Sequence, residues 1–161
     1  MVSPIYLLII PLAVAFFISF FDKIGRGLSL LLVYAAVAAM TALSGYWLYT
    51  AAATDAESMI FTAGFAPPLS IALRLGLEEA FFLSFGNLAA LGAAVVLFRR
   101  FAAESVTTMV LFLMVILGAQ GLVMTQDLFN LFVFLEISSI ATYSLIALDR
   151  NRESMAAGFK Y

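Results

Sequence analysis

A single carboxylate lies inside a long apolar stretch near the end of the chain. Between Leu128 and Leu148 there are 21 residues, and Glu136 is their only ionisable side chain apart from Tyr143. At about 1.5 Å per residue, a helix of this length reaches roughly 31 Å, which is enough to cross the hydrocarbon core of a bilayer. Glu136 would then lie near mid-membrane, where a carboxylate is costly and usually functional.

Helical spacing predicts which groups accompany this carboxylate. Glu136, Ser139 and Tyr143 fall on one stripe of the helix, which also contains Thr125, Phe129 and Phe132. The two hydroxyls can hydrogen-bond a carboxyl group or hold a water beside it, so the three residues could form a proton or ion path. The alternative is a protonated Glu that only bonds a neighbouring helix. Lys160 and Asp149 are further candidates on the cytoplasmic side, although Lys160 comes 24 residues after Glu136, past the end of the helix.

The composition predicts an all-α integral membrane protein. Of the 161 residues 65% are hydrophobic and 11% are charged, and the mean hydropathy is +1.10. The absence of Cys and His excludes disulfides, thiol catalysis and the usual zinc and haem sites within this sequence. The net charge of −2 gives no reason to expect nucleic acid as a partner.

Five apolar runs predict five transmembrane helices within one membrane domain, residues 1–161. Their approximate ranges are 4–21, 28–52, 80–98, 106–125 and 128–148. The third run carries small residues that predict close helix packing, namely Gly86, Asn87, Ala90, Gly92 and Ala93. Asn87 and Gln120 could belong to the site of a small-solute transporter, but they are as easily hydrogen-bond partners between helices.

The segment 54–79 has a different pattern. Ile71, Leu73, Leu75 and Leu77 alternate with other residues, which is the period of a strand, and residues 60–65 could pair with it across a turn at Pro67-Pro68. A short hairpin-like cap between the second and third helices and an irregular loop are both consistent with this pattern.

The distribution of basic residues predicts the orientation in the membrane. Seven of the eight Lys and Arg residues follow the first, third or fifth span, and Arg74 is the exception. The positive-inside rule then places the N-terminus outside, the C-terminus in the cytoplasm and the segment 54–79 on the extracytoplasmic side of the cell membrane.

Residues 124–161 resemble a known family. Asp127, the mid-helix Glu136, Ser138-Ser139, Tyr143, Arg150 and Arg152, and Lys160-Tyr161 follow the pattern of the antiporter-like subunits shared by respiratory complex I, Mrp-type Na+/H+ antiporters and membrane-bound hydrogenases. The segment FAPPLSIALRLGLEEAFF also resembles the stretch that precedes the third helix in this family.

The resemblance implies a fold of about fourteen helices with two inverted five-helix repeats, of which this chain would supply the first five helices. It also implies that a Lys on the seventh helix, which pairs with the fifth-helix Glu, lies outside this sequence. We therefore expect a split or truncated subunit whose partners are other membrane subunits, including a chain with the remaining helices and the mid-membrane Lys, and lipid.

Two functions are compatible with these features. The first is a proton- or cation-translocating, antiporter-like subunit of a multisubunit complex, either an Mrp-type antiporter or a redox-driven ion pump. The alternative is a structural assembly subunit without an ion path of its own. The sequence has no nucleophile–base pair, metal-ligand cluster or phosphate loop, so we expect no active site, metal or cofactor in this chain. Membership of a larger membrane oxidoreductase stays open.

Overall fold

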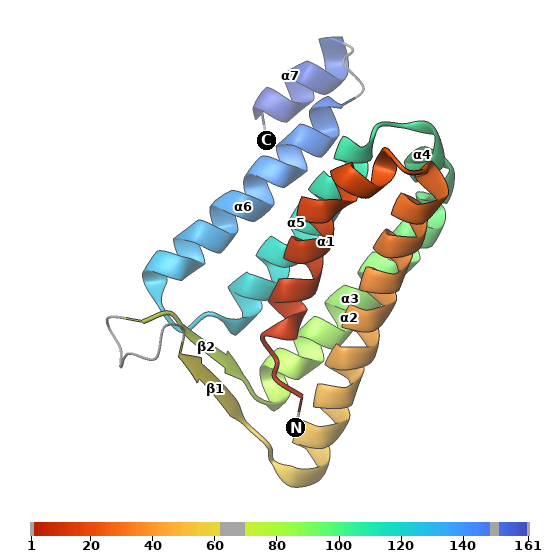
Figure 1. The fold of residues 1–161 in the computed structure, drawn as a ribbon. Helices are drawn as coiled ribbons and strands as arrows, with labels where there is room; N and C mark the ends of the chain where they lie inside the picture. Colours follow the sequence, from red (N-terminus) through yellow and green to blue (C-terminus); the bar gives the residue numbers. More distant parts are fainter. Residues whose placement is uncertain (1, 62–69, 149–151, 161) are drawn as a thin grey trace.

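The computed structural model describes residues 2–61, 70–148 and 152–160, which form a bundle of long helices with a small sheet at one end (Figure 1). The helices are α1 (Tyr6–Asp22), α2 (Arg26–Thr54), α3 (Leu77–Val96), α4 (Phe98–Ala103), α5 (Val106–Met124), α6 (Leu128–Ala147) and α7 (Arg152–Lys160). The strands are β1 (Ser58–Phe61) and β2 (Ala72–Leu75).

Four of these helices are long and apolar enough to cross a membrane, namely α2, α3, α5 and α6. Helix α1 is also apolar, but it has 17 residues, the lower limit for a span. The chain is therefore a mostly helical, multi-pass membrane protein. That α1 is a fifth span remains a prediction.

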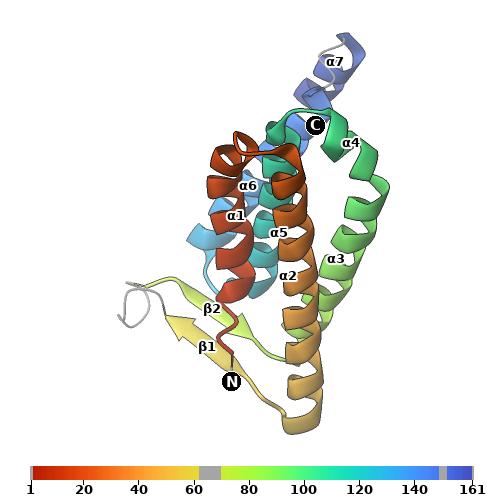
Figure 2. The ribbon, with the colours of Figure 1, turned by 45° about the vertical axis from the view of Figure 1, so that its right-hand side comes forward.

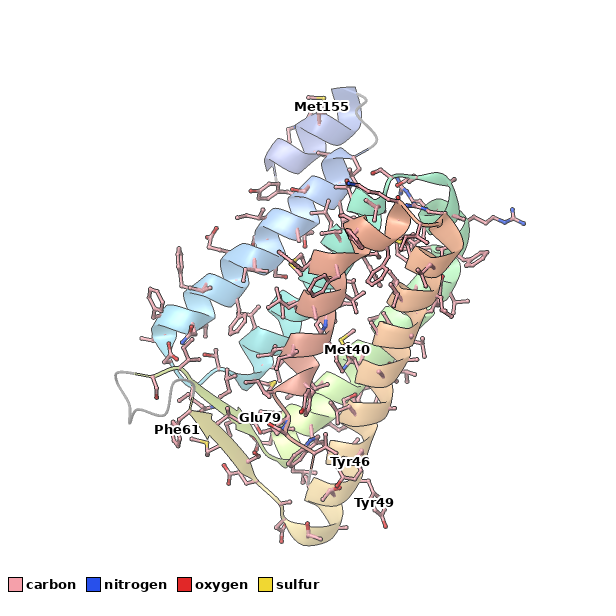
Figure 3. All side chains as sticks on the ribbon, viewed as in Figure 1. Met40, Tyr46, Tyr49, Phe61, Glu79 and Met155 are labelled. Carbon is pink, nitrogen blue, oxygen red and sulfur yellow. The ribbon has the colours of Figure 1, made fainter. Side chains whose placement is uncertain are left out.

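Helix α5 lies at the centre of the bundle. It packs against α1 on one side and α6 on another, while α2 packs against α1 and α3 (Figures 1 and 2). The core residues between these helices are mostly aliphatic and include the fully buried Met40, Val37, Met109 and Leu113. In Figure 3, Met40 marks the middle of the bundle. Helix α6 packs on α5 and α7, and therefore forms an outer edge of the molecule.

The two ends of the bundle carry different polar contacts. At one end Arg26 lies 3.0 Å from Asp22 and donates to the carbonyl of Phe101 at 2.6 Å, which ties the α1–α2 turn to α4. At the other end Arg74 on β2 pairs with Glu57 and lies 3.5 Å from Glu79 at the start of α3. Hydrogen bonds and ion pairs therefore hold each end of the bundle together.

The strands β1 and β2 pair antiparallel, with Ser58 opposite Leu75 and Phe61 opposite Ala72. The strand period at residues 71–77 thus corresponds to β2, while its partner begins two residues before the predicted range 60–65. The predicted turn at Pro67-Pro68 lies outside the described residues. Placing this sheet on the extracytoplasmic side remains a prediction.

Two features of the third apolar run differ from expectation. The predicted helix 80–98 begins earlier, at Leu77, and ends at Val96, after which the chain turns at Leu97 and continues as α4. Gly86 and Gly92 do not mark close contacts within this chain, because a Cβ atom added at either would meet no atom within 4 Å. Both glycines are exposed on the surface of α3.

Candidate functional site

The start of α6 is fixed by a side-chain cap. Asp127 accepts hydrogen bonds from the backbone N–H of Asn130 at 2.7 Å and from its side-chain amide at 2.5 Å. These two bonds to the carboxylate hold the pKa of Asp127 below its usual value. Just before the cap, the N–H of Gln126 donates to Ala72 on β2 at 2.9 Å, so the sheet holds the beginning of the helix.

One face of α6 lies very close to α5. A Cβ atom added at Gly118 would come within 2.7 Å of Ser138 Cβ and 2.9 Å of the carbonyl oxygen of Phe134, and one at Gly121 would overlap the Phe134 ring. Glycine at these two positions therefore lets the helices approach, as small residues commonly do between transmembrane helices. The contact determines which side of α6 faces the bundle.

The opposite face of α6, which carries Glu136, is uncovered. Glu136 is exposed, and its neighbours on the stripe, Phe129 and Phe132, are 75% and 60% exposed. In the most apolar 18-residue stretch of α6 only 11% of the residues are buried, whereas 44% are buried in the corresponding stretch of α5. Within the described part of the chain Glu136 has no hydrogen-bond or ion-pair partner. Such a face needs further contacts if the carboxylate lies inside a membrane.

The structure places the other predicted site residues as follows. Ser139 is half-buried and Tyr143 is exposed, both on α6, and no hydrogen bond joins either of them to Glu136 among the described residues. Lys160 is exposed near the end of α7. Asp149 lies outside the described residues. Glu136, Ser139 and Tyr143 thus lie along one stripe of α6, but among the described residues no hydrogen bond joins Glu136 to the other two.

Helix α7 turns back along α6 instead of continuing away from it (Figure 1). A Cβ atom added at Gly158 would lie 3.1 Å from the carbonyl oxygen of Tyr143 and 3.2 Å from Ala147 Cβ. Tyr143 and Ala147 are seven and eleven residues after Glu136, hence on the same face of α6. Because α7 folds back, Lys160 lies closer to Glu136 than their separation of 24 residues in the sequence suggests.

A buried polar cluster lies between α2, α3 and α5. Gln120 donates through Nε2 to Asn87 Oδ1 at 2.7 Å, and the side-chain amide of Asn87 lies 3.5 Å from the carbonyl oxygen of Met40. Asn87 and Gln120 thus hydrogen-bond each other between α3 and α5. Gln120 Oε1 is buried without a partner among the described residues. The cluster joins three helices, and nothing charged takes part in it.

The ion-pair cluster around Arg74 was not predicted from the sequence. Its guanidinium lies between the carboxylates of Glu57 and Glu79, and the bond to Glu57 together with the charge of Glu79 raises the pKa of Arg74. Glu79 also accepts from the N–H of Gly76 at 2.9 Å and is buried where α3 meets the sheet, as Figure 3 shows. The alternating pattern of a strand does not indicate which acidic residue an arginine on that strand will contact.

Among the described residues no group of three Asp, Glu, His or Cys side chains could hold a metal ion.

No protein-family model matches the chain. Two curated relatives are both named NADH-quinone oxidoreductase subunit N. The relative from Desulforudis audaxviator is 33% identical over 162 residues, covering 98% of this chain and 32% of its own length. The one from Myxococcus xanthus is 34% identical over 144 residues, covering 84% and 28%. The chain thus spans about a third of the length of these relatives.

Two solved structures have a similar fold. A chain of the membrane-bound sulfane sulfur reductase, an archaeal respiratory membrane complex, is 31% identical with a TM-score of 0.89, covering 96% of this chain and 32% of its own. A chain of the Mrp complex from Dietzia sp. DQ12-45-1b has a TM-score of 0.82 at 23% identity, covering 96% and 29%. The second likeness concerns the fold alone.

Proposed function

Because the chain belongs with the antiporter-like membrane subunits that these relatives represent, we propose that it forms part of a proton- or cation-translocating subunit in a multisubunit membrane complex. The observation that carries this proposal is Glu136, a carboxylate near the middle of an apolar membrane-spanning helix. Carboxylates at such depths are found mainly on ion paths.

Glu136 acts in this proposal by changing its protonation or its ion pair. The uncovered face of α6 is where a cation from elsewhere would approach, either a Lys on a later helix of the same subunit or one in a partner chain. Ser139 and Tyr143 line the route towards the end of α6 and hold water by their hydroxyl groups. Movement of the cation or filling of the water chain would load and unload the carboxyl group.

Lys160 contributes at the cytoplasmic side of this route. It follows Gly158 by two residues, about 3 Å farther along α7. Since Gly158 packs against Tyr143 and Ala147, and α7 runs back along α6, this step leads towards Glu136. Lys160 is therefore suited to attract or repel ions at the mouth of the path, as Asp149 would be from the preceding connection.

The proposed arrangement in the membrane has five spans, with α1 as the first. The N-terminus and the β1–β2 sheet lie outside, whereas α4 and α7 lie at the cytoplasmic surface with most of the basic residues. The remaining helices of a complete antiporter-like unit come from outside this sequence, in a continuation of the subunit or in another chain.

The alternative function is a structural subunit whose helices fill the complex without carrying ions. Ion flux through vesicles containing the assembled complex separates the two functions. Glu136→Gln preserves shape and hydrogen bonding but cannot carry a proton, so it should lower flux by roughly tenfold or more, since groups that transfer protons typically contribute 10²–10⁴ in rate. Glu136→Asp should be milder.

The matched control is Glu78→Gln, the same substitution at an exposed position in the first turn of α3. Subunit composition of each purified complex establishes that assembly is intact. Wild-type flux in an intact Glu136→Gln complex would favour the structural subunit.

A further inference from the structure

The first turns of α6, which precede Glu136, pack little against the rest of this chain. Of the eight described residues 128–135, only Asn130 is buried, and Leu128 and Phe129 are 84% and 75% exposed. The close approach of α6 to α5 begins only at Phe134. The position of this half of the helix therefore depends on what holds its beginning.

Strand β2 holds the beginning of α6 through the backbone. The N–H of Gln126 donates to the carbonyl oxygen of Ala72 at 2.9 Å, and Thr125 forms an antiparallel bridge with Leu73. Both strand residues are buried, so water has little access to this junction. Asp127, the N-cap of α6, follows directly after it.

An ion pair holds the same strand against α3. Arg74 on β2 lies 3.5 Å from Glu79, whose side chain is only 10% exposed. Glu79 also accepts from the N–H of Gly76 at 2.9 Å, so its carboxylate joins the end of β2 to the first turn of α3. Without Arg74, this buried carboxylate would lose its cation, which is costly. The pair between Arg74 and Glu57 is more exposed, and such pairs contribute little.

Figure 1 shows β2 between the beginnings of α3 and α6. We propose that Arg74 is a positioning residue for Glu136: it holds β2 on Glu79, and β2 holds the first turns of α6. The consequence for ion flux rests on the proposed function, whereas the effect on the start of α6 does not.

The test measures hydrogen–deuterium exchange in the complete membrane complex, resolved to single amides by mass spectrometry. Arg74→Gln should speed exchange several-fold at Asn130 and Leu131, whose N–H groups bond to Asp127 in the first turn of α6. Arg100→Gln is the matched control, because it removes an ion-paired arginine at the other end of the bundle. It should leave both amides unchanged.

Two further variants separate the roles of the two carboxylates. Glu79→Gln keeps an acceptor for the N–H of Gly76, since Gln also serves at this capping position, but it removes the charge. It should speed exchange at the start of α6 less than Arg74→Gln does, because no buried charge is left unpaired. Glu57→Gln should have little effect, because the Glu57 side chain is 50% exposed.

Ion flux through vesicles containing the same complexes tests the link to Glu136. A displaced start of α6 changes the surroundings of Glu136, so Arg74→Gln should shift the midpoint of the pH dependence of flux. Arg74→Lys keeps a positive charge opposite Glu79 and should return the midpoint towards the wild-type value. A lower flux with an unchanged midpoint would mean general damage and would overturn the positioning role.

The exchange data can also overturn the proposal. They do so if Asn130 and Leu131 exchange at the wild-type rate in Arg74→Gln, or if Arg100→Gln speeds them equally. Should Arg74→Gln not assemble, the same comparison is made with Glu79→Gln. Wild-type flux in Glu136→Gln would instead contradict the proposed function, and exchange alone would then show whether Arg74 holds α6.

Discussion

At the scale of single residues, glycines on α5 and a cap on α6 decide how Glu136 is presented. Gly118 and Gly121 bring α5 against the side of α6 that carries Phe134 and Ser138, so that Glu136 faces outwards. The atoms nearest to Gly118 belong to α6 backbone and to a Cβ atom, which cannot rotate away. The ring beside Gly121 is more adaptable.

Gly118→Ala should therefore destabilise the protein by about 1–3 kcal/mol, the usual cost of overpacking. Thermal denaturation in detergent, followed by circular dichroism, measures this change. Gly92→Ala is the control, because it has the same gain in helix propensity without a close neighbour, and it should be neutral or slightly stabilising. Equal midpoints for the two variants would mean that α5 and α6 are not in close contact.

Asp127→Ala should destabilise the protein by about 1 kcal/mol at neutral pH, since it removes an N-cap. The folded-state pKa of Asp127 is depressed, so its contribution is full above the unfolded-state value near 3.8 and is lost as pH falls through the lower folded-state value. The difference in thermal midpoint between wild type and Asp127→Ala should shrink below pH 3.8. Asp127→Asn can also cap the helix, and its stability should depend less on pH. If the difference in thermal midpoint between wild type and Asp127→Ala does not change with pH, the charge of Asp127 has no role in capping.

At the scale of elements, the long helices were predictable and the short ones were not. Each long helix has an apolar run of its own, which is a local signal. Helix α4 has six residues and α7 has nine, too few to distinguish from a loop by periodicity. The spacing also identified the stripe of Glu136 but not which way it faces, because that depends on Gly118 and Gly121 in another helix.

The orientation of the elements in the membrane can be tested by cysteine labelling. Single cysteines at Ser3 and at Ser58 on β1 should react with a membrane-impermeant maleimide added from outside intact cells. A cysteine at Ser105, between α4 and α5, should react after the membrane is made permeable. The reverse pattern would invert the proposed topology, and labelling of Ser3 and Ser105 from one side would mean that α1 and the later spans do not alternate as proposed.

At the scale of the whole molecule, the chain corresponds to about a third of the length of its relatives. It matches about a third of each relative, and its outer helix α6 presents Glu136 without cover. The family could be recognised from residues 124–161, because a mid-helix carboxylate between Asp127 and Tyr143 is unusual in an apolar span. The host complex could not be predicted, because complex I, Mrp-type antiporters and membrane-bound hydrogenases share this pattern of residues.

The most direct test of the central claim is a structure of the assembled complex, read at the Glu136 carboxylate. We expect a cationic nitrogen within about 6 Å of it, the range in which an opposite charge stabilises a carboxylate, or a chain of ordered waters beside Ser139 and Tyr143. A Glu136 carboxylate that is surrounded only by lipid hydrocarbon or apolar side chains would contradict an ion path through this residue.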